Sequence, residues 1–138
     1  MQPTSAEKGS AAGRCYCGAV EFVARFPSKF CAHCHCANCR RAHGAAFVTW
    51  VGFERDQVEI RAADGKLARY ATDTGATRTF CAACGTTLFF ESPRWAGEIH
   101  VVRSNFDGAI DREVEGNAFY RSHADWMDFS VPIERPRS

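Results

Sequence analysis

The sequence has no apolar run long enough to cross a membrane as a helix. Its first 13 residues have no apolar run either, so they lack the pattern of a secretory signal. We therefore expect a cytoplasmic protein without a membrane partner. The cytoplasm is reducing, and disulfides are rare there.

The sequence also lacks an excess of charge of either sign. Its 17 lysines and arginines nearly balance its 16 aspartates and glutamates, and the formal net charge is +1. A nucleic-acid-binding protein usually carries a basic patch or stripe. We therefore expect no nucleic-acid partner, and the sequence carries no signal for an oligomeric state.

A sustained helical period is missing as well, and the best helical turn is the short segment 37–43. Apolar residues alternate with polar ones over 20–26, as in a half-buried strand. Residues 46–53 are apolar on both faces, which predicts a central strand. Further strands are predicted at 57–61, 86–91 and 98–103. The pattern predicts a mostly β fold of antiparallel sheets.

No linker, repeat or low-complexity block divides the 138 residues, so one domain is expected. We place this domain at residues 13–133. Residues 1–12 are small and polar, and residues 134–138 are polar or charged. Both are expected to be flexible tails.

Cysteine is abundant, with eight residues in three clusters. The outer clusters are the pairs Cys15–Cys17 and Cys81–Cys84, and each pair is followed directly by glycine. A glycine tolerates the positive φ that closes a tight turn, so both sulfurs of a pair can point at one ion. Neither pair fills a tetrahedral site, but together they form the Cys₄ set of a structural zinc. Small buried thiols without metal are the other interpretation, which the paired spacing disfavours.

The middle cluster contains Cys34, Cys36 and Cys39 at the entry to the predicted helical turn. Three protein ligands leave a fourth position open, which is typical of a catalytic zinc. Arg40 and Arg41 follow directly. They can offset the negative charge of the thiolates or hold an anionic substrate, although many such charges are simply solvated.

Two alternatives for the middle cluster stay open. A fourth ligand would close the site and make it structural, and the candidates are Cys31, His33, His35 and His43. We predict that Cys31 is not a ligand, because it would force a tight turn beside a crowded triple. Cys-x-x-Cys pairs can also cycle as disulfides, but the βαβ pattern of thioredoxin-like proteins is missing.

Outside the cysteine clusters, His123 is the candidate for an acid/base group at the open zinc. A surface or structural histidine is the plainer interpretation. No catalytic triad is recognisable, and none is needed if a metal activates the substrate.

Taken together, the three motifs resemble those of the glutathione-dependent formaldehyde-activating enzyme family, whose domain centromere protein V shares. They are GRCYCGAV at 13–20, CHCANCRR at 34–41 and FCAACGT at 80–86. The resemblance implies a β-tent fold and two zinc ions per chain. It implies a structural zinc on Cys15, Cys17, Cys81 and Cys84 and a catalytic zinc on Cys34, Cys36 and Cys39.

The resemblance also implies an activity. The family's namesake reaction joins formaldehyde and glutathione, and its class is carbon–sulfur lyase. The expected partner is then a small thiol or aldehyde. The alternative is a non-catalytic zinc-binding module for a macromolecule. The termini are short and mixed in charge, which favours the enzyme.

Overall fold

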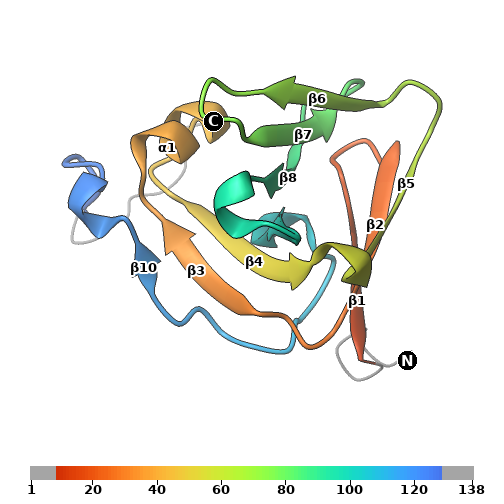
Figure 1. Cartoon of the computed structure of the whole chain (residues 1–138), viewed down its shortest axis with the longest axis horizontal. Helices are drawn as coiled ribbons and strands as arrows, with labels where there is room; N and C mark the ends of the chain where they lie inside the picture. The colour runs from red at the N-terminus through yellow and green to blue at the C-terminus, as the bar shows by residue number, and fades with distance from the viewer. Residues whose placement is uncertain (1–8, 129–138) are drawn as a thin grey trace, which may run out of the picture.

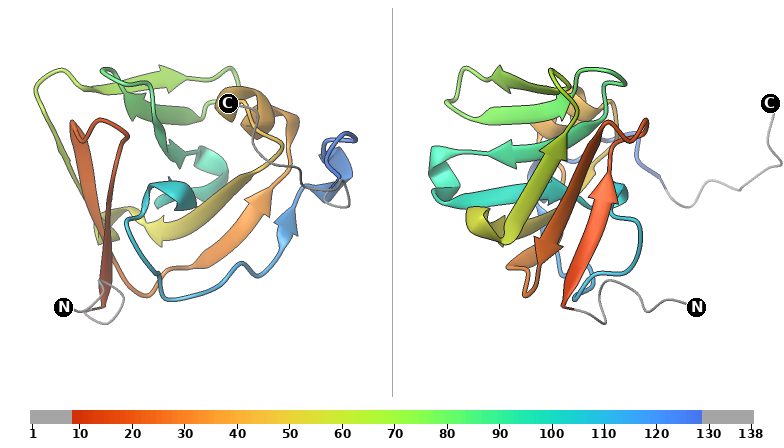
Figure 2. Two further views of the ribbon diagram at one scale, coloured as in Figure 1. Left: turned by 180° about the vertical axis from the view of Figure 1, so that it is seen from behind. Right: turned by 90° about the vertical axis from the view of Figure 1, so that its right-hand side faces the viewer.

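The computed structural model describes residues 9–128, which form two β-sheets packed face to face (Figure 1). The small sheet has the order β1-β2-β5 and is antiparallel. Its strands are β1 (Ser10–Arg14), β2 (Val20–Arg25) and β5 (Val58–Ala62). Figure 2 shows this sheet lying across one face of the larger one.

The large sheet has seven strands in the order β10-β3-β4-β9-β8-β7-β6. Its strands are β3 (Phe30–Cys34), β4 (Val48–Glu54), β6 (Leu67–Ala71), β7 (Thr77–Cys81), β8 (Thr87–Glu91), β9 (Glu98–Val102) and β10 (Asn117–Ala118). The pairings are antiparallel except that of β10 with β3, which is parallel. The prediction of a mostly β fold with antiparallel sheets is therefore confirmed.

Helical structure is limited to short elements. The α-helix α1 (Ala37–His43) coincides with the predicted helical turn. The 3₁₀ turns are η2 (Arg55–Gln57), η3 (Pro93–Trp95), η4 (Arg103–Asn105) and η5 (Tyr120–Ser122). Within the described part of the chain, no helix has the length and apolarity needed to cross a membrane.

The main core lies between the two sheets. Phe22 of β2 packs edge-on against Phe89 of β8 and Phe106, with ring centroids 5.4 Å and 5.1 Å apart. The opposite face of the large sheet carries a smaller cluster, which we call the second core. It consists of Cys34, Cys39, Val48, Trp50 and Val102. Strand β4 contributes to both cores, as expected for a strand that is apolar on both faces.

The N-terminal boundary differs from the prediction. Residues 10–12 were expected to belong to a tail, but they form part of β1. Ala11 is buried in the main core because β1 pairs along its whole length with β2. Gly13 is needed in this strand, since a Cβ there would collide with the ring of Phe22. Residues 1–8 and 129–138, including the predicted C-terminal tail, lie outside the described residues.

Candidate metal centres

The outer cysteine pairs meet in one cluster that joins the two sheets. Cys15 and Cys17 lie in the loop between β1 and β2 of the small sheet. Cys81 ends β7 of the large sheet, and Cys84 follows in the loop to β8. The four sulfur atoms lie within 4.8 Å of one another, so the cluster can hold a metal ion. We call it the four-cysteine cluster.

The sulfur separations in this cluster fit a tetrahedral ion. Sγ of Cys17 lies 3.7 Å from Sγ of Cys15 and 3.8 Å from Sγ of Cys81. Zinc–sulfur bonds of ~2.3 Å in tetrahedral geometry place two sulfurs roughly 3.8 Å apart. A disulfide would need a separation of about 2.05 Å, so these thiols are not paired.

The backbone of both loops is arranged around the sulfurs. The glycines after the two pairs, Gly18 and Gly85, have φ of +84° and +82°, as expected for glycines that close tight turns. The amide of Val20 donates to Sγ of Cys15 at 3.3 Å, and the amide of Ala83 donates to Sγ of Cys81 at the same distance. Such donors stabilise negative charge on the sulfurs.

A hydroxyl group contributes to the same cluster. Thr86 Oγ1 lies 3.1 Å from Sγ of Cys84, and this hydrogen bond lowers the pKa of Cys84 to about 5. Thr86 Oγ1 also accepts a hydrogen bond of 3.0 Å from the amide of Tyr16. Thr86 therefore connects the cysteine loop of the small sheet to that of the large sheet.

The middle cysteines form a second cluster, which we call the cysteine triad. Cys34 ends β3, Cys36 is the N-cap of α1, and Cys39 lies in the first turn of that helix. Sγ of Cys34 is 3.5 Å from Sγ of each of the other two. Sγ of Cys36 caps the helix by accepting from the amide of Cys39 at 3.3 Å. The cap that starts α1 thus also gathers the three sulfurs at one point.

Cys31 lies apart from the triad. It is three residues before Cys34 on the same strand, and side chains of a strand alternate between the two faces. Cys31 is therefore buried in the main core, with 1% of its surface exposed, whereas Cys34 belongs to the second core. This placement agrees with the prediction that Cys31 is not a ligand.

The three histidines considered as a fourth ligand also have other contacts. His33 Nδ1 lies 2.8 Å from Thr49 Oγ1, and His35 Nε2 lies 2.9 Å from Asn117 Oδ1. His43 Nδ1 lies 2.9 Å from the hydroxyl of Thr87. Among residues 9–128, the triad gathers no fourth cysteine, histidine or carboxylate.

A comparison with known protein families includes the residues of both clusters. The family model for the glutathione-dependent formaldehyde-activating enzyme matches residues 10–126. This chain belongs to that family. The match includes all seven cysteines of the two clusters, and it begins at the first residue of β1.

Two individual relatives share a quarter to a third of their residues with this chain over the matched regions. An uncharacterized lyase of Schizosaccharomyces pombe is 33% identical over 78 residues, which are 56% of this chain. The chain spans about half the length of that curated relative, since the match covers 55% of it. A crystal structure of a Rhodobacter sphaeroides protein matches with a TM-score of 0.63 and 25% identity, covering 78% of this chain and 99% of the other.

The sequence motifs of the family did not reveal Arg78, which reaches the triad from β7. Its Nη2 donates to Sγ of Cys39 at 3.7 Å, and its guanidinium lies 4.8 Å from the ring centroid of Phe90. The hydrogen bond with Cys34 and the nearby Arg78 lower the pKa of Cys39 to about 5, although burial opposes the shift. Arg78 is 39 residues from Cys39 in sequence, so only the sheet brings them together.

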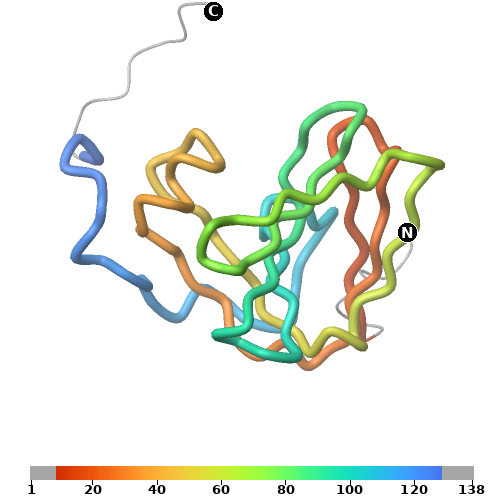
Figure 3. The backbone as a smooth tube through the Cα atoms, turned by 45° about the horizontal axis from the view of Figure 1, so that its top comes forward, coloured from red at the N-terminus to blue at the C-terminus, as the bar shows by residue number. Residues whose placement is uncertain are grey.

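The predicted substrate residues lie elsewhere. Arg40 donates to the carbonyl oxygens of His35 at 3.2 Å and Ser122 at 2.9 Å. Arg40 and Arg41 line a surface pocket of about 350 Å³ beside α1, together with Trp126. The guanidinium of Arg40 therefore connects α1 to the C-terminal segment, which consists of β10 and η5. Its strand β10 runs alongside β3 (Figure 3).

His123 is likewise engaged with this C-terminal segment. Its Nδ1 donates to the carbonyl oxygen of Tyr120 at 2.6 Å, and its ring stacks on the Tyr120 ring at 4.3 Å. The His123 ring comes within 6.4 Å of the buried ring of His35. The structure thus places His123 against η5 and His35.

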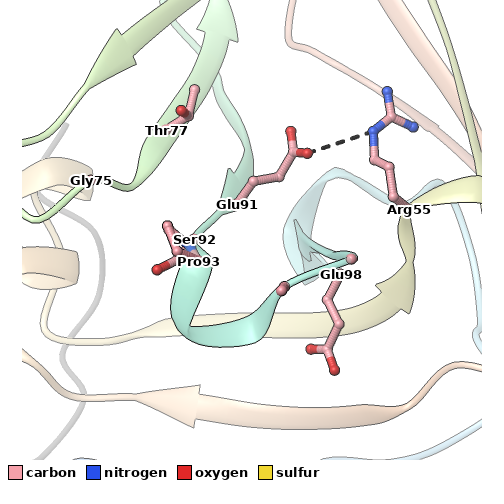
Figure 4. Close-up of a pocket in the computed structure, with 9 residues that line it drawn as sticks. Arg55, Gly75, Thr77, Glu91, Ser92, Pro93 and Glu98 are labelled. Carbon is pink, nitrogen blue, oxygen red and sulfur yellow. Dashed lines mark ion pairs between the residues drawn. The ribbon is translucent and has the colours of Figure 1, made fainter.

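A second surface pocket, of about 310 Å³, lies between η3 and the turn after β6 (Figure 4). Arg55 and Glu91 form an ion pair of 3.7 Å across it, and Glu98 lies on its rim. No cysteine lines this pocket. It is separate from both candidate metal centres.

Proposed function

We propose that the chain is a zinc-dependent carbon–sulfur lyase that acts on the adduct of a small thiol, of the glutathione type, with an aldehyde such as formaldehyde. The family supports a formaldehyde-activating or lyase-type function, and the relative from S. pombe carries the name of a lyase. The observation that carries the proposal is the difference between the clusters: one gathers four sulfurs and the other three.

The four-cysteine cluster is proposed as the structural zinc site. Four thiolates complete a tetrahedral shell, and such closed sites serve folding. The cluster also takes its residues from both sheets, so an ion there would hold the two sheets together. All eight cysteines are unpaired in the structure, which suits the reducing cytoplasm that we propose as its location.

The cysteine triad is proposed as the catalytic zinc site. A zinc ion there would act as a Lewis acid or lower the pKa of a bound thiol. Cys34, Cys36 and Cys39 would hold it and leave room for one further ligand. Trp50 and Val48 border the sulfurs on the sheet side and are almost fully buried, so water is excluded from that side.

The proposed chemistry needs no nucleophilic side chain. In the forward direction the thiol sulfur forms a bond to the aldehyde carbon, and the π electrons of the C=O bond move to oxygen. The thiol proton ends on that oxygen, so the product is an S-hydroxymethyl thioether. The lyase direction reverses each of these steps.

The test is an NMR exchange measurement with ¹³C-formaldehyde and glutathione. The adduct forms spontaneously, so the quantity measured is the exchange rate between hydrated formaldehyde and adduct with and without zinc-replete protein. We expect acceleration by the wild type and loss of acceleration in Cys39→Ser. Cys31→Ala removes a buried thiol outside the triad and is the matched control. An unchanged exchange rate with wild-type protein would refute the proposal.

A further inference from the structure

Arg78 lies in an unusual setting for a charged side chain. It projects from β7 opposite Phe90 of β8 and Tyr70 of β6, so it is on the same face of the sheet as the second core. Its guanidinium stacks over the Phe90 ring and reaches Sγ of Cys39. An aromatic face and a sulfur can both stabilise a cation. Neither contact is the carboxylate with which an arginine usually forms an ion pair.

The hydrogen bonds of this guanidinium are incomplete. Among residues 9–128, Arg78 forms no ion pair with a carboxylate, unlike Arg55, Arg61 and Arg112. Its Nη1 atom is buried and has no hydrogen-bond partner in the described structure. A buried donor without a partner destabilises the fold, and a charged donor does so most, so such a donor usually has a role.

The charge of Arg78 is balanced by the triad. Three thiolates and one divalent ion carry a net charge of −1, so one guanidinium makes the centre neutral. Nη2 already contacts Cys39, which leaves Nη1 as the donor for a further group. A guanidinium presents its donors in a planar fork suited to anionic oxygen.

We propose that Arg78 is the oxyanion-binding residue of this centre: its Nη1 donates to an anionic oxygen of the ligand beside the cysteine triad. The role of that oxygen in the reaction rests on the proposed function. It is the aldehyde oxygen, which gains negative charge when the thiol attacks. Arg78 stabilises this charge by one hydrogen bond and by its proximity.

Arg40 does not compete for this role. Its Nε and Nη2 donate to two main-chain carbonyl oxygens, those of His35 and Ser122. Arg41 lies beside the surface pocket with Trp126. Of the arginines that carry a hydrogen bond or cation–π contact in the described residues, Arg78 is the one that contacts a sulfur of the triad.

The experiment uses formate as a stable one-carbon oxyanion. Zinc-replete wild type, Arg78→Met and Arg78→Lys are titrated with ¹³C-formate, and binding is followed by NMR. We expect binding about 10- to 100-fold weaker in Arg78→Met, the loss typical of a hydrogen bond to a charged group. Arg78→Lys keeps the charge without the planar fork and should be intermediate. Arg69→Met, at an exposed position of β6, is the matched control and should bind as the wild type.

The outcomes are distinct. Equal formate binding by wild type and Arg78→Met would overturn the inference, as would failure of the wild type to bind formate. Loss of zinc from both Arg78 variants, measured by elemental analysis, would also overturn it, since Arg78 would then act only as a counter-charge to the thiolates. If formate binding depends on Arg78 but the thiol–aldehyde exchange is not accelerated, the oxyanion site stands and the proposed reaction fails.

Discussion

Replacing Cys81 with serine should destabilise the domain far more than replacing Cys36. A metal ion in the four-cysteine cluster would close the 63 residues from 18 to 80 into a loop, whereas an ion in the triad would enclose only residues 35–38 between its outer members. In the chain-entropy model for cross-links, closing loops of these lengths stabilises the fold by about 4 and about 2 kcal/mol, respectively. The first value is a large part of the 5–15 kcal/mol that is typical of a whole domain.

The structure adds a second reason for the difference. Cys81 is fully buried and its cluster takes residues from both sheets, so loss of an ion there would weaken the connection between two layers that share the main core. Cys36 is only partly buried at the start of α1, and the strands beneath it remain paired without it. We therefore expect the melting temperature to fall by about 15 °C in Cys81→Ser and by at most about 8 °C in Cys36→Ser.

Thermal unfolding of zinc-replete protein, followed by circular dichroism, measures both losses. Cys31→Ala is the control for removing a buried thiol that is not a ligand, and it should cost about 1 kcal/mol. Equal and large losses in Cys81→Ser and Cys36→Ser would refute the reasoning, because both centres would then be structural.

Three further outcomes are expected. Elemental analysis of protein purified without chelator should give two zinc ions per chain, and one ion at full occupancy would contradict the two-centre proposal. Gly52→Ala should lower the free energy of unfolding by about 1–3 kcal/mol, since its Cβ would collide with the ring of Phe30, while Gly108→Ala, with open space, should be neutral in the same urea titration. Burial is the main cause that lowers the pKa of His43 to about 4, and the charge of Arg78 is the second cause. The fold therefore favours neutral His43. This contribution to stability is complete above pH 6.5 and is lost as the pH falls toward 4. His43→Gln should therefore lose less stability than the wild type over that range, by up to roughly 3 kcal/mol, and equal slopes would contradict the assignment.

The cysteine spacing was sufficient to predict how the clusters divide. Ligands within a pair are close in sequence, so a tight turn decides their geometry, and the positive φ of Gly18 and Gly85 shows that turn. The helix at 37–43 was predictable for the same reason, because Cys36 caps it locally. The central strand β4 was predictable because it is apolar on both faces.

The remaining elements depend on contacts distant in sequence. Strand β1 consists mostly of small residues with low β propensity, and pairing with β2 determines its conformation. Strand β10 has only two residues, too few for any pattern. Arg78 was not predicted because β7 was not recognised as a strand, and its contact with Cys39 exists only across the sheet.

The alternation of side chains on β3 also determines which of its cysteines can form a disulfide under oxidising conditions. Two residues three positions apart on a strand have Cα atoms about 10 Å apart, and a disulfide tolerates at most ~7 Å. Cys31 and Cys34 therefore cannot cross-link in the folded chain, even though they form a Cys-x-x-Cys motif. Oxidation of the triad would therefore be confined to its own three sulfurs, because the thiol of Cys31 is buried inside the main core. Strand β3 thus places Cys31 and Cys34 on opposite faces, where oxidation of one does not involve the other.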